Sequence, residues 1–157
     1  MKAYSRRRLL KSALAAAAFP YLVPGSAFGA NERVTMAIIG TGGRGRHLAR
    51  QFTKLSEVRV VAACDVDARE RKKCLDETHR QYGDADCRAY ADFRDVMARS
   101  DIDAVTVATP DHWHALISIA AARAGKHVFF EKPLANSIGE SKALRDAVRA
   151  SGVVLQT

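Results

Sequence analysis

Apolar and polar positions follow two alternating periods from residue 33 to the end of the chain. Short apolar runs, typical of buried strands, cover 33–39, 57–64, 87–90, 103–108, 126–130 and 153–156. Amphipathic helical patterns cover 43–55, 67–82, 92–99, 112–124 and 137–151, and Gly125 and Gly152 are expected to end the last two. Strands that alternate with helices across short connections predict an α/β fold, a Rossmann-type doubly wound parallel sheet.

The first apolar run leads directly into the motif G-x-G-x-x-G, formed by Gly40, Gly42 and Gly45. Gly40 permits a tight turn, Gly42 leaves room for a pyrophosphate against bare backbone, and Gly45 lets the next helix pack close to the strand. A helix that begins near Gly43 directs its free N–H groups and its positive dipole end at that pyrophosphate. The pattern predicts a dinucleotide site.

Asp65 supports this interpretation. It ends the second apolar run and lies 20 positions after Gly45, near the offset expected for the acid that binds an adenosine ribose. The alternative is a structural turn with a helix-capping Asp. An acid there repels a 2′-phosphate and so favours NAD, but Arg44 and Arg69 could reach such a phosphate, and NADP is not excluded.

Four chemically distinctive clusters follow the predicted strands: the glycine turn, Asp65, the run from Thr109 to His114, and the run from Glu131 to Pro133. Because ligands bind beyond the carboxyl ends of parallel strands, all four are expected at one edge of the sheet. The residues expected to contact the cofactor are Gly40, Thr41, Gly42, Gly43, Arg44, Gly45, Asp65, Thr109, Pro110, Trp113, His114, Glu131, Lys132 and Pro133. Trp113 and His114 are expected to wall the nicotinamide pocket or to contact a cofactor ribose.

Lys132 is the candidate catalytic residue. Partial desolvation and a neighbouring positive nicotinamide ring favour a neutral amine, whereas Glu131 favours the ammonium. A neutral amine can take the proton of an alcohol as hydride leaves its carbon. The alternative is an exposed Glu-Lys pair before a proline turn.

No metal site is expected. His112 and His114 stand two apart on a helix start, do not share a face, and have no third ligand. The three cysteines are odd in number and lack C-x-x-C spacing, which indicates neither a disulfide framework nor a zinc site; they are Cys64, Cys74 and Cys87.

Residues 1–30 have the order of an export signal: a positive start, a short apolar stretch and small residues. The run from Ser5 to Lys11 resembles a twin-arginine signal, with Leu9 in the position of its phenylalanine. We expect cleavage between Ala27 and Ala30, the twin-arginine translocase as a partner, and a periplasmic or otherwise exported protein. The alternatives are an uncleaved N-terminal anchor or a basic disordered tail.

Most of the net positive charge of the chain comes from residues 1–30. Residues 1–30 carry five basic side chains and no acid, which is +5 of the formal net charge of +8. The remainder is only +3, so the basic composition gives no argument for nucleic acid as a partner.

Together these motifs resemble the N-terminal domain of the Gfo/Idh/MocA family, which includes glucose–fructose oxidoreductase and inositol dehydrogenase. The resemblance covers 33–157, and its most specific parts are Thr109-Pro110 with His114 and the run Glu131-Lys132-Pro133. It implies hydride transfer to and from sugar or cyclitol hydroxyls. It also implies that Lys132 is the family's lysine in proton transfer and that Glu131, Pro110, His114 and the glycines line the cofactor.

Members of that family carry a second domain that supplies substrate contacts and the oligomer interface. No such domain follows Thr157, so we expect residues 31–157 to be a cofactor-binding fragment that is incomplete for catalysis, with a homo-oligomer only for a full-length form. Two alternatives stay open: an NAD-dependent glycoside hydrolase of the same architecture, and a non-catalytic nucleotide-binding module. The sequence identifies neither the sugar nor its stereochemistry.

Overall fold

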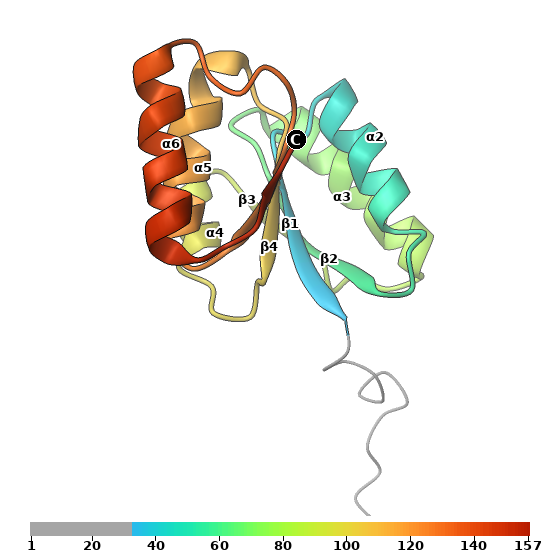
Figure 1. Cartoon of the computed structure of the whole chain (residues 1–157). Coiled ribbons are helices and arrows are strands. Elements are labelled where there is room, and N and C mark those ends of the chain that lie inside the picture. The colour runs from blue at the N-terminus through green and yellow to red at the C-terminus, as the bar shows by residue number, and fades with distance from the viewer. Residues whose placement is uncertain (1–32) are drawn as a thin grey trace, which may run out of the picture. The chain divides into compact units, whose positions relative to one another are not determined.

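A computed structural model describes residues 33–157, and it shows a parallel sheet with helices on both faces (Figure 1). The six strands are β1 (Val34–Ile39), β2 (Val58–Cys64), β3 (Arg88–Tyr90), β4 (Ala104–Val107), β5 (His127–Phe130) and β6 (Leu155–Gln156). The helices are α2 (Gly43–Phe52), α3 (Ala68–Tyr82), α4 (Phe93–Met97), the 3₁₀ turn η3 (Asp111–Trp113), α5 (His114–Arg123) and α6 (Ile138–Ser151). The predicted Rossmann-type fold is confirmed.

The strand order is β3-β2-β1-β4-β5-β6, and every neighbouring pair is parallel. The chain therefore starts in the middle of the sheet, runs outward to β3, returns to β4 beside β1, and runs outward again to β6. The order reverses between β1 and β4, and a crevice at the carboxyl ends of these strands is the usual ligand site in such sheets.

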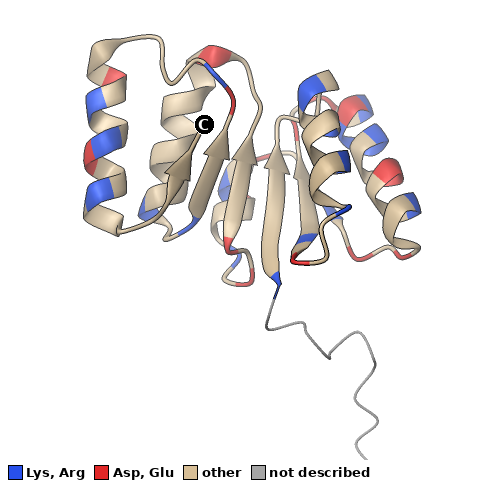
Figure 2. Cartoon of the chain, turned by 45° about the vertical axis from the view of Figure 1, so that its right-hand side comes forward, with Lys and Arg blue, Asp and Glu red and all other residues tan. Residues whose placement is uncertain are grey.

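The period of two along β1 divides the core into two layers. Ala37 and Ile39 belong to the layer that includes Leu144 of α6, whereas Met36 and Ile38 pack in the layer that includes Cys74 of α3. The charged side chains lie mainly on the helices, and the strands are almost free of them (Figure 2). Burial on both faces explains why the strands read as nearly continuous apolar runs.

Two predicted helices differ from the structure. The helix expected over 112–124 begins as η3, whose Trp113 N–H donates to the carbonyl of Pro110 over 2.9 Å, and continues as α5 only from His114. The helix expected over 43–55 ends at Phe52, because Thr53 closes its last turn through Ala49 and Gln51. Both differences depend on backbone turns that the apolar pattern does not encode.

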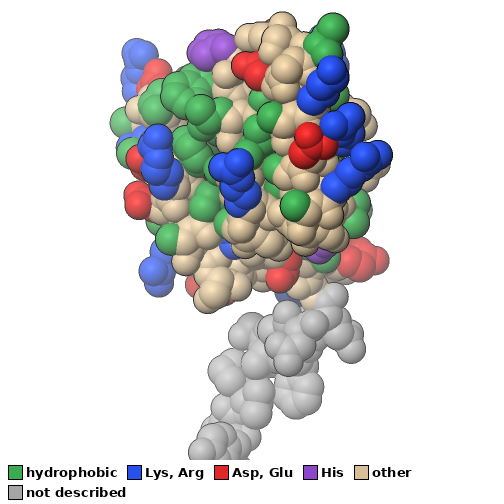
Figure 3. All heavy atoms as spheres, turned by 60° about the vertical axis from the view of Figure 1, so that its left-hand side comes forward, with side chains coloured by type: hydrophobic (Ala, Val, Ile, Leu, Met, Phe, Trp, Pro, Cys, Tyr) green, Lys and Arg blue, Asp and Glu red, His purple; other side chains and the backbone are tan. Residues whose placement is uncertain are grey.

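The outer face of the α5–α6 layer leaves some large apolar side chains exposed, and such side chains gather on the upper part of this face in Figure 3. Leu116 is 48% exposed and Ile138 is 76% exposed. Within residues 33–157, no helix has the length and apolarity that a membrane span requires.

All three cysteines are buried, which leads to a testable prediction. Burial raises the pKa of the thiols to about 12 for Cys64, about 11 for Cys74 and about 12 for Cys87. We expect no reaction with Ellman's reagent at pH 8 in the native protein and reaction of all three thiols in denaturant.

The raised pKa values of the thiols also predict how the stability of the fold depends on pH. Because the folded-state pKa values lie above the unfolded value of about 8.5, the folded state retains these protons longer, and the free energy of unfolding falls as pH rises above about 8.5. Urea titrations at pH 7.5 and 10 measure this loss. Rapid labelling of a native thiol, or a higher stability at pH 10, would contradict it.

Candidate nucleotide-binding site

The three motif glycines meet different surroundings. Gly40 has φ +86°, and a Cβ there would lie 2.6 Å from the carbonyl carbon of Ala108. A Cβ on Gly45 would lie 1.8 Å from the carbonyl oxygen of Gly40. A Cβ on Gly42 would meet nothing within 4 Å. The fold itself therefore requires glycine at 40 and 45, whereas Gly42 leaves an open space in front of α2.

The N-terminus of α2 has uncapped N–H groups that an anion could bind. Gly42 is its N-cap and offers no side chain, and the first turn contains no acid. By contrast, α3, α4 and α6 are capped by side chains that accept a backbone N–H, from Asp67, Asp92 and Ser137. The first N–H groups of a helix need a partner, and a phosphate can supply it where no side chain does. The open space at Gly42 and the missing cap fit a pyrophosphate.

Asp65 connects the end of β2 with the glycine turn. Its Oδ2 accepts a hydrogen bond from the backbone N–H of Thr41 over 2.6 Å and lies 3.2 Å from the Thr41 hydroxyl. Its Oδ1 accepts from the N–H of Asp67 over 2.9 Å. A carboxylate has about four acceptor positions, so one remains for a ribose hydroxyl. Asp65 thus orders the turn as well as facing the crevice.

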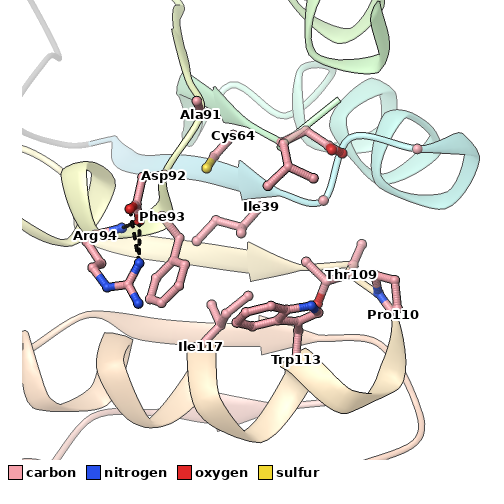
Figure 4. A pocket seen from close by; sticks show the side chains of 15 residues that line it. Ile39, Cys64, Ala91, Asp92, Phe93, Arg94, Thr109, Pro110, Trp113 and Ile117 are labelled. Atoms are coloured by element: carbon pink, nitrogen blue, oxygen red, sulfur yellow. Dashed lines mark hydrogen bonds and ion pairs between the residues drawn. The ribbon is translucent and has the colours of Figure 1, made fainter. Parts of the chain in front are cut away.

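A cavity of about 440 Å³ opens between the ends of β2 and β4 (Figure 4). Trp113 and Ile117 form one wall, and Phe93 and Arg94 lie across from them. Of the residues predicted for the cofactor site, it is lined by Gly40, Gly42, Asp65, Thr109, Pro110 and Trp113. Trp113 therefore lines the same cavity as Asp65.

The segment 91–94 also lines this cavity, although the sequence interpretation did not include it. Arg94 Nη1 pairs with Asp92 Oδ2 over 3.0 Å, and the backbone N–H of Arg94 lowers the pKa of Asp92. The signal that could have found it was available: β3 is a short strand, and the rule that ligands bind beyond carboxyl ends applies to it as well.

Thr109 gives a second indication of a ligand. Its Oγ1 is buried and has no hydrogen-bond partner within the described part of the chain, and Thr109 lines the cavity. Buried hydroxyls are rarely left without a partner, and a bound polar group would supply one.

The loop after β5 lies beside the glycine turn. Arg44 Nε donates to Glu131 Oε1 over 2.6 Å, and this ion pair joins residues 87 positions apart. Lys132 follows Glu131 and is exposed, and its peptide bond to Pro133 is cis. The structure therefore brings Lys132 to the edge that carries the glycine motif.

His114 is placed differently from the expectation that it lines the cofactor pocket. Its side chain is 1% exposed, and both ring nitrogens meet backbone carbonyls: Nδ1 lies 2.7 Å from Pro133 O and Nε2 lies 2.8 Å from Thr109 O. The ring contacts the loops that contain Thr109 and Pro133, and both of its nitrogens are occupied by these contacts.

The predicted residues thus form three groups. One lines the cavity, as described above; a second shapes the glycine turn and consists of Thr41, Gly43 and Gly45; the third surrounds the β5 loop and consists of Arg44, His114, Glu131, Lys132 and Pro133. Among residues 33–157, no three His, Cys, Asp or Glu side chains converge in a way that could hold a metal ion.

Comparisons with known proteins agree with this geometry. Residues 34–157 match the family described as an oxidoreductase family with an NAD-binding Rossmann fold, GFO_IDH_MocA. The chain is 35% identical over 126 residues to a glycosyl hydrolase family 109 protein of Saccharopolyspora erythraea, covering 78% of this chain and 27% of that protein.

Two solved structures are similar. GenD2 from gentamicin A biosynthesis, in complex with NAD, is 30% identical with a TM-score of 0.70, over 80% of this chain and 34% of that one. The myo-inositol 2-dehydrogenase of Lactobacillus plantarum is 28% identical with a TM-score of 0.69, over 79% and 35%. The chain spans about a third or less of the length of these relatives. The match over nearly all described residues shows that this chain belongs to the Gfo/Idh/MocA oxidoreductase family and contains its NAD-binding Rossmann domain.

Proposed function

We propose that this domain serves an oxidoreductase that transfers hydride between a nicotinamide nucleotide and a hydroxyl of a sugar or cyclitol. The observation that carries the proposal is the Arg44–Glu131 ion pair, because it puts the Lys132 loop against the turn that receives the pyrophosphate. The names of the similar proteins, a myo-inositol 2-dehydrogenase and a protein of gentamicin biosynthesis, support a polyhydroxylated substrate.

Each part of the edge has a role in this proposal. The N–H groups of α2 bind the pyrophosphate, the cavity beside Asp65 and Trp113 holds the adenosine, and the nicotinamide extends toward the β5 loop. The bound nucleotide supplies the hydride chemistry. Lys132 moves the proton of the reacting hydroxyl, and its exposure leaves its amine free to reach a substrate. Glu131 is paired with Arg44 over 2.6 Å.

Replacement of Lys132 tests this division of roles. We expect Lys132→Ala to leave the NADH affinity within about twofold of the original, because the lysine holds the substrate proton rather than the nucleotide. In a full-length form that includes the family's second domain, the rate of NADH formation from hexoses, anhydrosugars or cyclitols should fall by about 100-fold or more. Lys142→Ala, on the outer part of α6, is the matched control and should change neither quantity. An unchanged rate in Lys132→Ala would favour the non-catalytic module.

Glycoside hydrolysis is the second candidate, and the family 109 relative is the observation that favours it. A hydrolase of this kind oxidises its sugar transiently and reduces it again, so bound nucleotide is regenerated. Incubation of a full-length form with a nitrophenyl glycoside and no added NAD distinguishes the two functions. Release of nitrophenol without net NADH would select the hydrolase, whereas NADH formation without nitrophenol would select the dehydrogenase.

We further propose export by the twin-arginine route, from the run Ser5 to Lys11, which lies outside the described residues. That route carries folded proteins, so a nucleotide bound in the cytoplasm could travel with the domain. Replacement of both Arg6 and Arg7 by Lys should keep the protein in the cytoplasmic fraction, while Arg33→Lys should not. Unimpaired export of the double variant would contradict the proposal.

A further inference from the structure

The ring of His114 lies between two loops that the proposed reaction uses. On one side, the carbonyl of Thr109 belongs to the loop after β4; on the other, the carbonyl of Pro133 directly follows Lys132. The ring also packs edge-on against Phe130, with ring centroids 6.1 Å apart and an interplanar angle of 77°. The side chain is therefore fixed in place from three directions.

Both ring nitrogens of His114 lie within hydrogen-bond distance of a backbone carbonyl. Nδ1 lies 2.7 Å from the Pro133 oxygen and Nε2 lies 2.8 Å from the Thr109 oxygen. Carbonyl oxygens only accept hydrogen bonds, so a ring N–H that points to either oxygen ties that loop to the start of α5.

Few charged groups surround the ring. The titratable or charged side chains on the elements next to it are Asp111 and His112 of η3, Glu131 and Lys132 after β5, Arg44 of α2, Arg123 and His127 at the far ends of α5 and β5. Within the described residues none of them hydrogen-bonds to His114, and Glu131 is paired with Arg44. The two carbonyls are therefore the polar groups that the ring contacts.

We propose that His114 is a positioning residue: a clasp that holds the Lys132 loop at a fixed distance from the Thr109 loop through its contacts with the two carbonyls. This inference rests on the proposed function, since it assigns the nicotinamide end of the site to the space between these loops. The adenosine end lies in the cavity beside Asp65, which His114 does not line. Loss of the clasp should therefore affect the two ends of the nucleotide unequally.

The test compares two ligands. His114→Gln should weaken NADH binding by about tenfold and leave ADP-ribose binding within about twofold, because only NADH reaches the β5 loop. Ser118→Ala is the matched control and should alter neither affinity: Ser118 lies one turn later on α5, is buried, and its hydroxyl has no hydrogen-bond partner among residues 33–157. Equal weakening of both ligands by His114→Gln would reduce His114 to a general structural role and overturn the proposal.

The two proposals fail in different ways. If the unaltered protein bound ADP-ribose and NADH equally well and Lys132→Ala did not change turnover, the proposed function would be wrong. The clasp would be overturned separately, by equal weakening of NADH and ADP-ribose binding in His114→Gln.

Discussion

Gly42→Val is expected to abolish NADH binding while the domain stays folded. A Cβ at this position meets no protein atom within 4 Å, so the folded protein accommodates it. The added methyl groups would occupy the space in front of α2 where a pyrophosphate approaches the uncapped N–H groups. Hydrogen bonds to a charged group contribute about 1.5–3 kcal/mol each, so the loss of two weakens binding by about 100-fold or more.

Calorimetric titration measures the NADH affinity of Gly42→Val. A thermal melt followed by circular dichroism measures whether the variant stays folded. The melting temperature should stay within a few degrees of the original. Gly139→Val is the matched control, because Gly139 lies in the first turn of α6, where a Cβ would come no closer than 3.8 Å to Ser137 Oγ. Wild-type affinity in Gly42→Val would show that the nucleotide does not use this turn.

Gly45→Ala is expected to have the opposite effect and to damage the fold itself. Its Cβ would lie 1.8 Å from the carbonyl oxygen of Gly40, and both atoms belong to backbone or are fixed to it. No rotamer can relieve such an overlap, so α2 must move away from β1. We expect the free energy of unfolding to fall by about 4 kcal/mol or more, which is exceptional for a single substitution.

Urea denaturation of Gly45→Ala and Gly43→Ala gives the comparison. For a domain of this size, 4 kcal/mol corresponds to a melting temperature lower by roughly 15 °C. Gly43 lies two residues earlier, where a Cβ would meet nothing within 4 Å, and its alanine variant should be as stable as the original. Equal stabilities of the two variants would mean that α2 does not pack against the Gly40 turn as described.

The fold could be predicted from the sequence because its signals are local. Apolar runs such as Val58–Cys64 are buried on both faces of the sheet, and Gly125 and Gly152 end α5 and α6 with φ of +73° and +68°. The glycine motif and Asp65 have fixed spacings in such folds. These features depend on neighbouring residues or on one rule of topology, which a single sequence contains.

The details of the site depend on contacts between distant residues, which no spacing reveals. Arg44 is a candidate partner for a 2′-phosphate by its sequence position, but it pairs with Glu131, 87 positions away. The sequence places His114 in the cofactor pocket, but its ring contacts the carbonyls of Thr109 and Pro133. The strand before segment 91–94 is predicted, but no motif residue in the segment marks it as part of the cavity.

We expect the loops at one edge of this sheet to receive a nicotinamide nucleotide with its adenosine beside Trp113. Trp113 is the single tryptophan of the chain, so its emission reports on that end of the site. Titration with NADH and with ADP-ribose should change Trp113 fluorescence saturably, whereas nicotinamide mononucleotide at the same concentrations should not. A Trp113 signal that stays constant with both adenosine-containing ligands, or that responds to the mononucleotide alone, would contradict this placement of the nucleotide.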